Sequence, residues 1–109
     1  MANLFVYGSL QPGGPNEHVL SAIGGEWSRA TVKGYLKENG WGARLGYPGL
    51  VLDETGPDIS GHVLSSPDIG DILDELDRFE GEDYERVETS VTLESAEKID
   101  VHIYVLRDA

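Results

Sequence analysis

Residues 87–105, Val-Glu-Thr-Ser-Val-Thr-Leu-Glu-Ser-Ala-Glu-Lys-Ile-Asp-Val-His-Ile-Tyr-Val, contain the clearest strand pattern of this chain. Two parts of this stretch, Val87–Leu93 and Ile99–Val105, each alternate between β-branched residues and polar ones. Because successive side chains of a strand point to opposite faces, this alternation predicts two consecutive β-strands.

Further strands and two helices are predicted upstream of this pair. Short apolar or alternating segments bounded by turn residues predict four earlier strands: Leu4–Tyr7, Trp27–Leu36, Gly49–Asp53 and Ile59–Leu64. Turn residues at Asn39–Gly42 and Thr55–Asp58 separate them, and Asn16 can cap a short helix that ends at Gly24. Strands outnumber helices without a strand–helix–strand rhythm. We therefore expect one α+β domain over residues 1–109, built around a curled, mostly antiparallel sheet or small barrel.

Composition and charge exclude several functional classes. The chain has no cysteine, so it has no disulfide, no thiolate zinc site and no cysteine nucleophile. Its formal net charge of −12 repels phosphate backbones and anionic lipids, so we expect neither nucleic acid nor a membrane as a partner. The three histidines lack metal-ligand spacing and no nucleotide-binding glycine motif occurs, so no metal or other cofactor is expected. Residues 1–5 lack the basic flank and the length of a signal peptide, and we expect a cytoplasmic protein.

The second helix is predicted between the fourth strand and the final pair. Ser66 can cap this helix, Pro67 fits its first turn, and Gly81 marks its end. Its apolar residues recur at helical spacing: Ile69, Ile72, Leu73, Leu76 and Phe79. At about 100° per residue they occupy one sector of the helix, and Glu80 falls inside that sector, roughly 20° from Ile69. A carboxylate is therefore predicted on the apolar face.

Glu80 has two interpretations. Apolar surroundings and the negative end of the helix dipole both disfavour a charged carboxylate, so both raise its pKa. The pKa then approaches the range in which a carboxylate acts as a general acid or base near neutral pH. In the alternative interpretation, the side chain frays into solvent at the helix end and has no chemical role.

The turn Tyr7-Gly8-Ser9-Leu10 gives a second candidate site. Because Gly8 has no side chain to block a close approach, successive backbone N–H groups at this strand end can bind a carboxylate or a developing oxyanion. The alternative is an ordinary turn after a strand. Ser9 lacks the second glycine of a nucleophile elbow, so the motif of a serine hydrolase is incomplete.

A series of short motifs runs along almost the whole chain. Its members are Val6–Leu10, Pro12–Gly14, Asn16–Leu20, Gly34–Leu36, Tyr47–Gly49, Ile59–Val63, Leu76–Gly81 and Ile103–Val105. This ordered set resembles the gamma-glutamylcyclotransferase-like family, in particular its short single-domain, gamma-glutamylamine cyclotransferase-like branch. The resemblance implies a small mixed, mostly antiparallel β-barrel of five to six strands with two flanking helices.

The resemblance also implies a function and a site. In the family, the glutamate of the Phe-Glu-Gly segment is the catalytic acid/base, and this position is Glu80 here. The substrate pocket lies at the Tyr7–Leu10 turn. The implied enzyme is a transferase or lyase of the acyltransferase type, in which the α-amine of a small gamma-glutamyl compound attacks the γ-carbonyl. It releases 5-oxoproline and a free amine or amino acid, and it requires no cofactor.

Three further residues are expected to line the pocket. Tyr84 and Arg86 lie two residues apart, so they share one face if the segment is extended, and both match family positions beside the pocket. Arg86 can instead pair with Glu80 or neutralise the surrounding acids. Tyr104 is expected to contribute its ring to the pocket wall. Since the net charge of −12 disfavours an anionic substrate at long range, we expect either slow association of the substrate or a locally basic pocket built from Arg86 and Arg44.

Two other functional classes remain open for the same fold. A non-catalytic module would use the pocket to bind a small metabolite. An adaptor would bind a basic partner through the acidic surface between Asp68 and Glu88, in a complex that salt weakens. The apolar position of Glu80 favours the enzyme, because a pure binding protein has no evident use for it. A glycosidase would need a second buried acid opposite Glu80, and the sequence pattern predicts no such residue.

Overall fold

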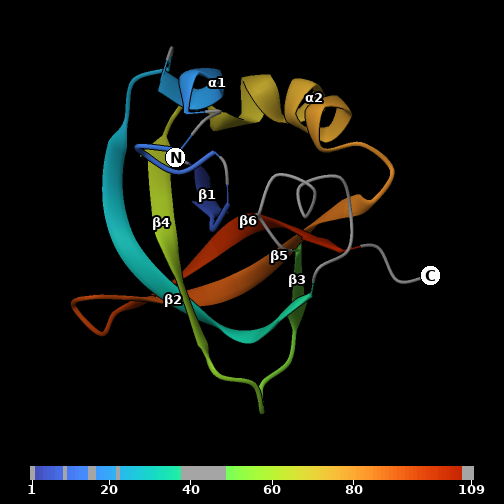
Figure 1. The fold of residues 1–109 in the computed structure, drawn as a ribbon. Helices are drawn as coiled ribbons and strands as arrows, with labels where there is room; N and C mark the ends of the chain where they lie inside the picture. Colours follow the sequence, from blue (N-terminus) through green and yellow to red (C-terminus); the bar gives the residue numbers. More distant parts are fainter. Residues whose placement is uncertain (1, 9, 15–16, 22, 38–48, 107–109) are drawn as a thin grey trace.

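Figure 1 shows the computed structural model, which describes residues 2–8, 10–14, 17–21, 23–37 and 49–106. The elements in this part of the chain are β1 (Ala2–Val6), α1 (His18–Ser21), β2 (Glu26–Lys37), β3 (Gly49–Leu52), β4 (Asp58–Ser66), α2 (Ile69–Glu80), β5 (Tyr84–Leu93) and β6 (Lys98–Leu106). The six predicted strands are therefore confirmed. The predicted helix cap Asn16 and the turn at Asn39–Gly42 lie outside the described residues.

Five of the strands close into a barrel, and β3 is added at its side. The sheet order is β3-β2-β4-β1-β6-β5, and an additional pairing between β2 and β5 closes the barrel. Strands β1 and β6 run parallel, whereas the other pairs are antiparallel. Both helices lie at the same end of this barrel (Figure 1). The expected small, mostly antiparallel barrel with two flanking helices is confirmed.

The hydrophobic core consists of two clusters that share strands. Successive residues of a strand point to opposite faces, so Phe5 of β1 faces one cluster while Leu4 and Val6 face the other. The interior cluster comprises Phe5, Ala30, Val32, Leu50, Val63, Val91, Val101, Ile103 and Val105. The helix cluster comprises Leu4, Val6, Leu10, Leu20, Leu64, Ile69, Leu76, Tyr84 and Tyr104.

Close packing between β1 and β4 requires a glycine. A Cβ atom on Gly61 would lie 2.5 Å from both the ring of Phe5 and the carbonyl oxygen of Val6, so no larger residue fits there without a shift. This contact brings β4 onto β1, and β1 leads directly into the Tyr7–Leu10 turn. The glycine therefore helps to place one part of the candidate site.

Helix α2 begins later than the sequence predicted. Ser66 is still part of β4, where it pairs with Ala2, and this pairing keeps its backbone extended. The N-cap residue is Asp68, whose N–H donates a hydrogen bond of 3.1 Å to Ser66 Oγ. The predicted end of the helix is confirmed, because Gly81 has a φ of +78° and its N–H donates to the carbonyl oxygen of Asp77. Among the described residues, no helix has the length and apolar character needed to cross a bilayer.

Candidate active site

Glu80 is the last residue of α2, and its environment favours the neutral carboxyl group. The helix presents Ile69 and Leu76 to the helix cluster, and Glu80 lies one turn after Leu76. The Glu80 side chain is half-buried rather than frayed into solvent. Burial raises the pKa of Glu80 from its ordinary value of 4.5 to about 7. Near neutral pH both protonation states are therefore populated, as acid/base chemistry requires.

The electrostatic influence of Glu80 reaches two tyrosines from other elements. Burial is the main cause that raises the pKa of Tyr7 and of Tyr104, and the charge of Glu80 adds to the effect on both. The hydroxyl of Tyr84 also raises the pKa of Tyr7. The carboxylate of α2 therefore influences phenol groups from two other parts of the fold, Tyr7 directly after β1 and Tyr104 of β6.

Hydrogen bonds hold the described part of the Tyr7–Leu10 turn. The Tyr7 hydroxyl donates to the carbonyl oxygen of Tyr104 at 2.7 Å and accepts from the N–H of Leu50 at 3.1 Å. The carbonyl oxygen of Gly8 accepts from the N–H of Gln11 at 3.2 Å and from Gln11 Nε2 at 3.3 Å. Leu10 is buried in the helix cluster, and Ser9 lies outside the described residues.

Tyr84, Arg86 and Tyr104 lie around one cavity beside the end of α2. The cavity has a volume of about 320 Å³, and its described lining also includes Asp77, Gly81 and Glu85. Because β5 is extended, Tyr84 and Arg86 share a face, as their spacing predicted.

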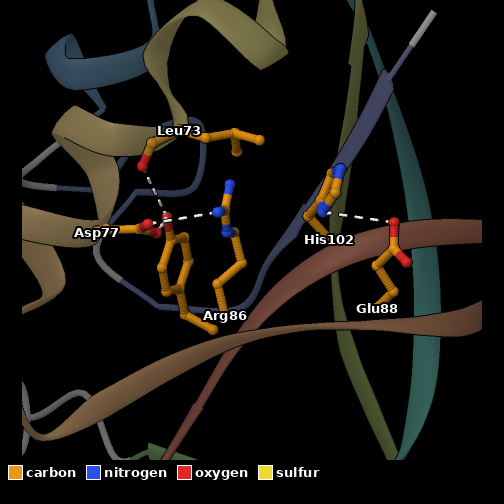
Figure 2. A network of polar contacts seen from close by, with 6 residues as sticks. Leu73, Asp77, Arg86, Glu88 and His102 are labelled. Atoms are coloured by element: carbon orange, nitrogen blue, oxygen red, sulfur yellow. Dashed lines mark hydrogen bonds and ion pairs between the residues drawn. The ribbon is translucent and has the colours of Figure 1, made fainter.

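The acid that pairs with Arg86 in Figure 2 is Asp77. Arg86 Nη2 lies 3.4 Å from Asp77 Oδ2, while the Tyr104 hydroxyl donates to Asp77 Oδ1 at 2.6 Å. The same hydroxyl lies 3.4 Å from the carbonyl oxygen of Leu73. The sequence left open whether Arg86 pairs with Glu80 or neutralises the surrounding acids. The contact with Asp77 agrees with the second alternative.

The charge of this cavity does not match the basic pocket that was one of the two expected alternatives. Two carboxylates, Asp77 and Glu85, accompany the single guanidinium of Arg86, so the described lining is not basic. The expectation of a basic pocket overlooked Asp77, which reaches the cavity from the neighbouring helix. The other expected cation, Arg44, lies outside the described residues.

Asp77 is the residue at this site that sequence reasoning missed. On the helical wheel it lies at roughly 80° from Ile69, just beyond the apolar sector, so it resembles any acid at the edge of a solvated face. The sequence spacing could have revealed it. Asp77 lies three residues before Glu80, and residues with this spacing are neighbours on one face of a helix. Within the described parts of the chain, no three His, Asp or Glu side chains form a group that could hold a metal ion.

Comparison with known proteins identifies the family. A family model described as gamma-glutamyl cyclotransferase, AIG2-like matches residues 4–109 of this chain. The chain belongs to this family. No curated protein is significantly similar to the sequence.

The solved structures that are similar to this AIG2-like chain include the following three. At5g39720.1 from Arabidopsis thaliana is 33% identical with a TM-score of 0.72, and the match covers 98% of this chain and 69% of that one. YkqA from Bacillus subtilis is 24% identical with a TM-score of 0.75, over 97% of this chain but only 36% of that chain. An AIG2-like protein (GGACT) from Mus musculus is 24% identical with a TM-score of 0.69, over 96% and 76% of the two chains. The last two similarities show the shared fold.

Proposed function

We propose that this AIG2-like protein is a gamma-glutamyl cyclotransferase, which releases 5-oxoproline and a free amine or amino acid from a small gamma-glutamyl compound. The observation that carries the proposal is Glu80, a half-buried carboxylate with a pKa of about 7 in the Phe-Glu-Gly segment. The charge of Glu80 contributes to the raised pKa of Tyr7, which supports a site shared with the turn where the resemblance expects the substrate. Membership of the family supports the same reaction class.

The reaction needs one residue that can both accept and return a proton. Glu80 in its charged form takes a proton from the α-ammonium group of the substrate, and the free amine attacks the γ-carbonyl carbon to close a five-membered ring. Protonated Glu80 donates its proton to the leaving nitrogen as the bond between this nitrogen and the γ-carbon breaks. Glu80, charged again, then takes the second proton that the ring nitrogen must lose to become the amide of 5-oxoproline, and this proton passes to the released amine, which departs as an ammonium ion. Because the nucleophile is part of the substrate, the enzyme mainly has to hold the folded-back conformer.

The remaining predicted site residues have binding roles in this proposal. Backbone N–H groups of the Tyr7–Leu10 turn bind the substrate carboxylate or the tetrahedral oxyanion, a contact worth about 3 kcal/mol in the transition state. The hydrogen bonds of the Tyr7 hydroxyl and of the Gly8 carbonyl oxygen support this role because they anchor the turn to β3, to β6 and to Gln11 before the substrate arrives. Tyr84, Arg86 and Tyr104 form the neighbouring wall.

A direct assay of 5-oxoproline release tests the proposal. The purified protein is incubated with gamma-glutamyl dipeptides, gamma-glutamyl amines and glutathione, with Glu80→Gln as the matched control. Glutamine is nearly isosteric with glutamate, so the variant should keep its circular dichroism spectrum and lose release by at least about 100-fold. Full activity in Glu80→Gln would show that the mechanism is wrong. Binding of a panel member without release from the wild type would indicate a metabolite-binding module instead.

A further inference from the structure

Tyr104 connects the end of α2 to the turn that follows β1. Its backbone carbonyl oxygen accepts the 2.7 Å hydrogen bond from the Tyr7 hydroxyl, and its own hydroxyl donates the 2.6 Å bond to Asp77. The Tyr7 hydroxyl in turn accepts from the N–H of Leu50 in β3. A continuous series of polar contacts therefore runs from β3 through β6 to the last turn of α2.

Asp77 holds this last turn by its side chain and by its backbone. One carboxylate oxygen accepts from Tyr104 of β6, and the other lies 3.4 Å from Arg86 of β5 (Figure 2). Its carbonyl oxygen accepts the N–H of Gly81 at 3.0 Å, a backbone bond that spans Glu80. The position of Glu80 is thus tied to that of Asp77, one turn earlier.

We propose that Asp77 is a positioning residue, which anchors the last turn of α2 to Tyr104 and Arg86 and so holds the Glu80 carboxylate in its half-buried place. The kinetic consequence rests on the proposed function. The position of Glu80 is a property of the fold and can be measured without any substrate.

Loss of this anchor changes the environment of Glu80 in a definite direction. The ionisable groups around the site come from several elements: Tyr7 after β1, Tyr84, Glu85 and Arg86 of β5, Tyr104 of β6 and Asp77 of α2. Without the contacts of Asp77, the helix end can move away from β5 and β6, and water reaches Glu80. Hydration favours the charged carboxylate, so its pKa falls from about 7 toward 4.5.

The test compares three variants with the wild type. Asp77→Ala removes the anchor, and Tyr104→Phe removes only the hydroxyl donor, so it changes no charge near neutral pH and keeps the carbonyl group that Tyr7 needs. Asp74→Ala is the matched control, because Asp74 is an exposed acid on the same helix. The pKa of Glu80 is measured from the carboxyl ¹³C chemical shift as a function of pH, and kcat and KM are measured across the same pH range.

We expect Asp77→Ala and Tyr104→Phe to lower the pKa of Glu80 by at least about one unit, and Asp74→Ala to leave it unchanged. The acidic limb of the kcat profile should move to lower pH by the same amount. At the optimum, kcat should fall roughly ten- to a hundred-fold with a smaller change in KM, because the base is misplaced while substrate binding is retained. Contacts with a purely structural role would lower stability and leave both pH profiles in place.

Two results would overturn the inference. The first is that Asp77→Ala and Tyr104→Phe fold and that the pKa of Glu80 in both equals its pKa in the wild type and in Asp74→Ala. The second is a change confined to KM, which would make Asp77 a substrate contact. If Asp77→Ala fails to fold, the pKa of Glu80 in Tyr104→Phe decides whether the inference holds. If the wild type releases no 5-oxoproline, the proposed function fails, and the titration of Glu80 still decides whether Asp77 positions it.

Discussion

The interior cluster and the helix cluster use the same strands for different purposes. The interior cluster is aliphatic apart from Phe5, and it fills the barrel. The helix cluster contains Tyr84 and Tyr104, and α2 brings Glu80 and Asp77 to its edge. Apolar burial inside the barrel favours folding directly, whereas partial burial of hydroxyl and carboxyl groups has a free-energy cost. The comparison indicates that the barrel supplies stability and the helix-covered face supplies chemistry.

The largest effect on stability is expected inside the barrel. Phe5 is 1% exposed in the interior cluster, so Phe5→Ala should lower the free energy of unfolding by about 3–5 kcal/mol. The matched control is Phe79→Ala. Because Phe79 is only partly buried at the helix cluster, its substitution should lower the free energy of unfolding by a smaller amount. Urea unfolding of both variants measures the difference. Equal losses would show that the two clusters contribute alike to stability.

A pH-dependent effect of about 3 kcal/mol is expected from Glu80. Its pKa is about 7 in the folded protein against 4.5 ordinarily, so the folded state binds more protons than the unfolded state between these values. The contribution of this residue is therefore most favourable below pH 4.5, and it declines as the pH rises to about 7. Urea unfolding at several pH values measures the slope. Glu80→Gln should flatten it, and an unchanged slope in this variant would contradict the assignment.

A smaller loss is expected when the link between the two clusters is cut. Tyr7→Phe removes the hydroxyl that accepts from the buried Leu50 N–H and donates to the carbonyl oxygen of Tyr104. Leaving these backbone groups without that partner should lower the free energy of unfolding by about 1–3 kcal/mol. Tyr35→Phe serves as the control, since Tyr35 is 43% exposed and should change little. Similar thermal midpoints for the two variants would show that the Tyr7 link adds no stability.

The smallest effect is expected at an ion pair away from the helices. Lys33 and Asp58 pair at 3.0 Å on neighbouring strands, but their side chains are 58% and 62% exposed. Water and salt screen such a contact, so Lys33→Ala should change the free energy of unfolding by no more than about 0.5 kcal/mol. Chemical denaturation at low and high salt checks this. If Lys33→Ala lowered the free energy of unfolding as much as Tyr7→Phe does, exposed ion pairs would contribute to the stability of this fold as much as the polar contacts between its two clusters.

Short-range patterns were sufficient to predict most elements of the fold. Strands β5 and β6 follow from their alternation, and α2 follows from apolar residues three and four apart. The error at the start of α2 shows the limit of such patterns. Ser66 has the chemistry of a helix cap, yet its pairing with Ala2 in the sheet keeps it in β4.

Local sequence patterns alone predict which residues face the core and that Glu80 is among them, because these properties depend on the periods of strands and helices. The parallel pairing of β1 with β6 and the contact of β2 with β5 that closes the barrel are known only from the folded chain. The β5–β6 pairing places Arg86 directly opposite Tyr104, and the packing of α2 against these strands brings Asp77 to both. No local period encodes such contacts, since they depend on the register between strands and on how a helix packs against them.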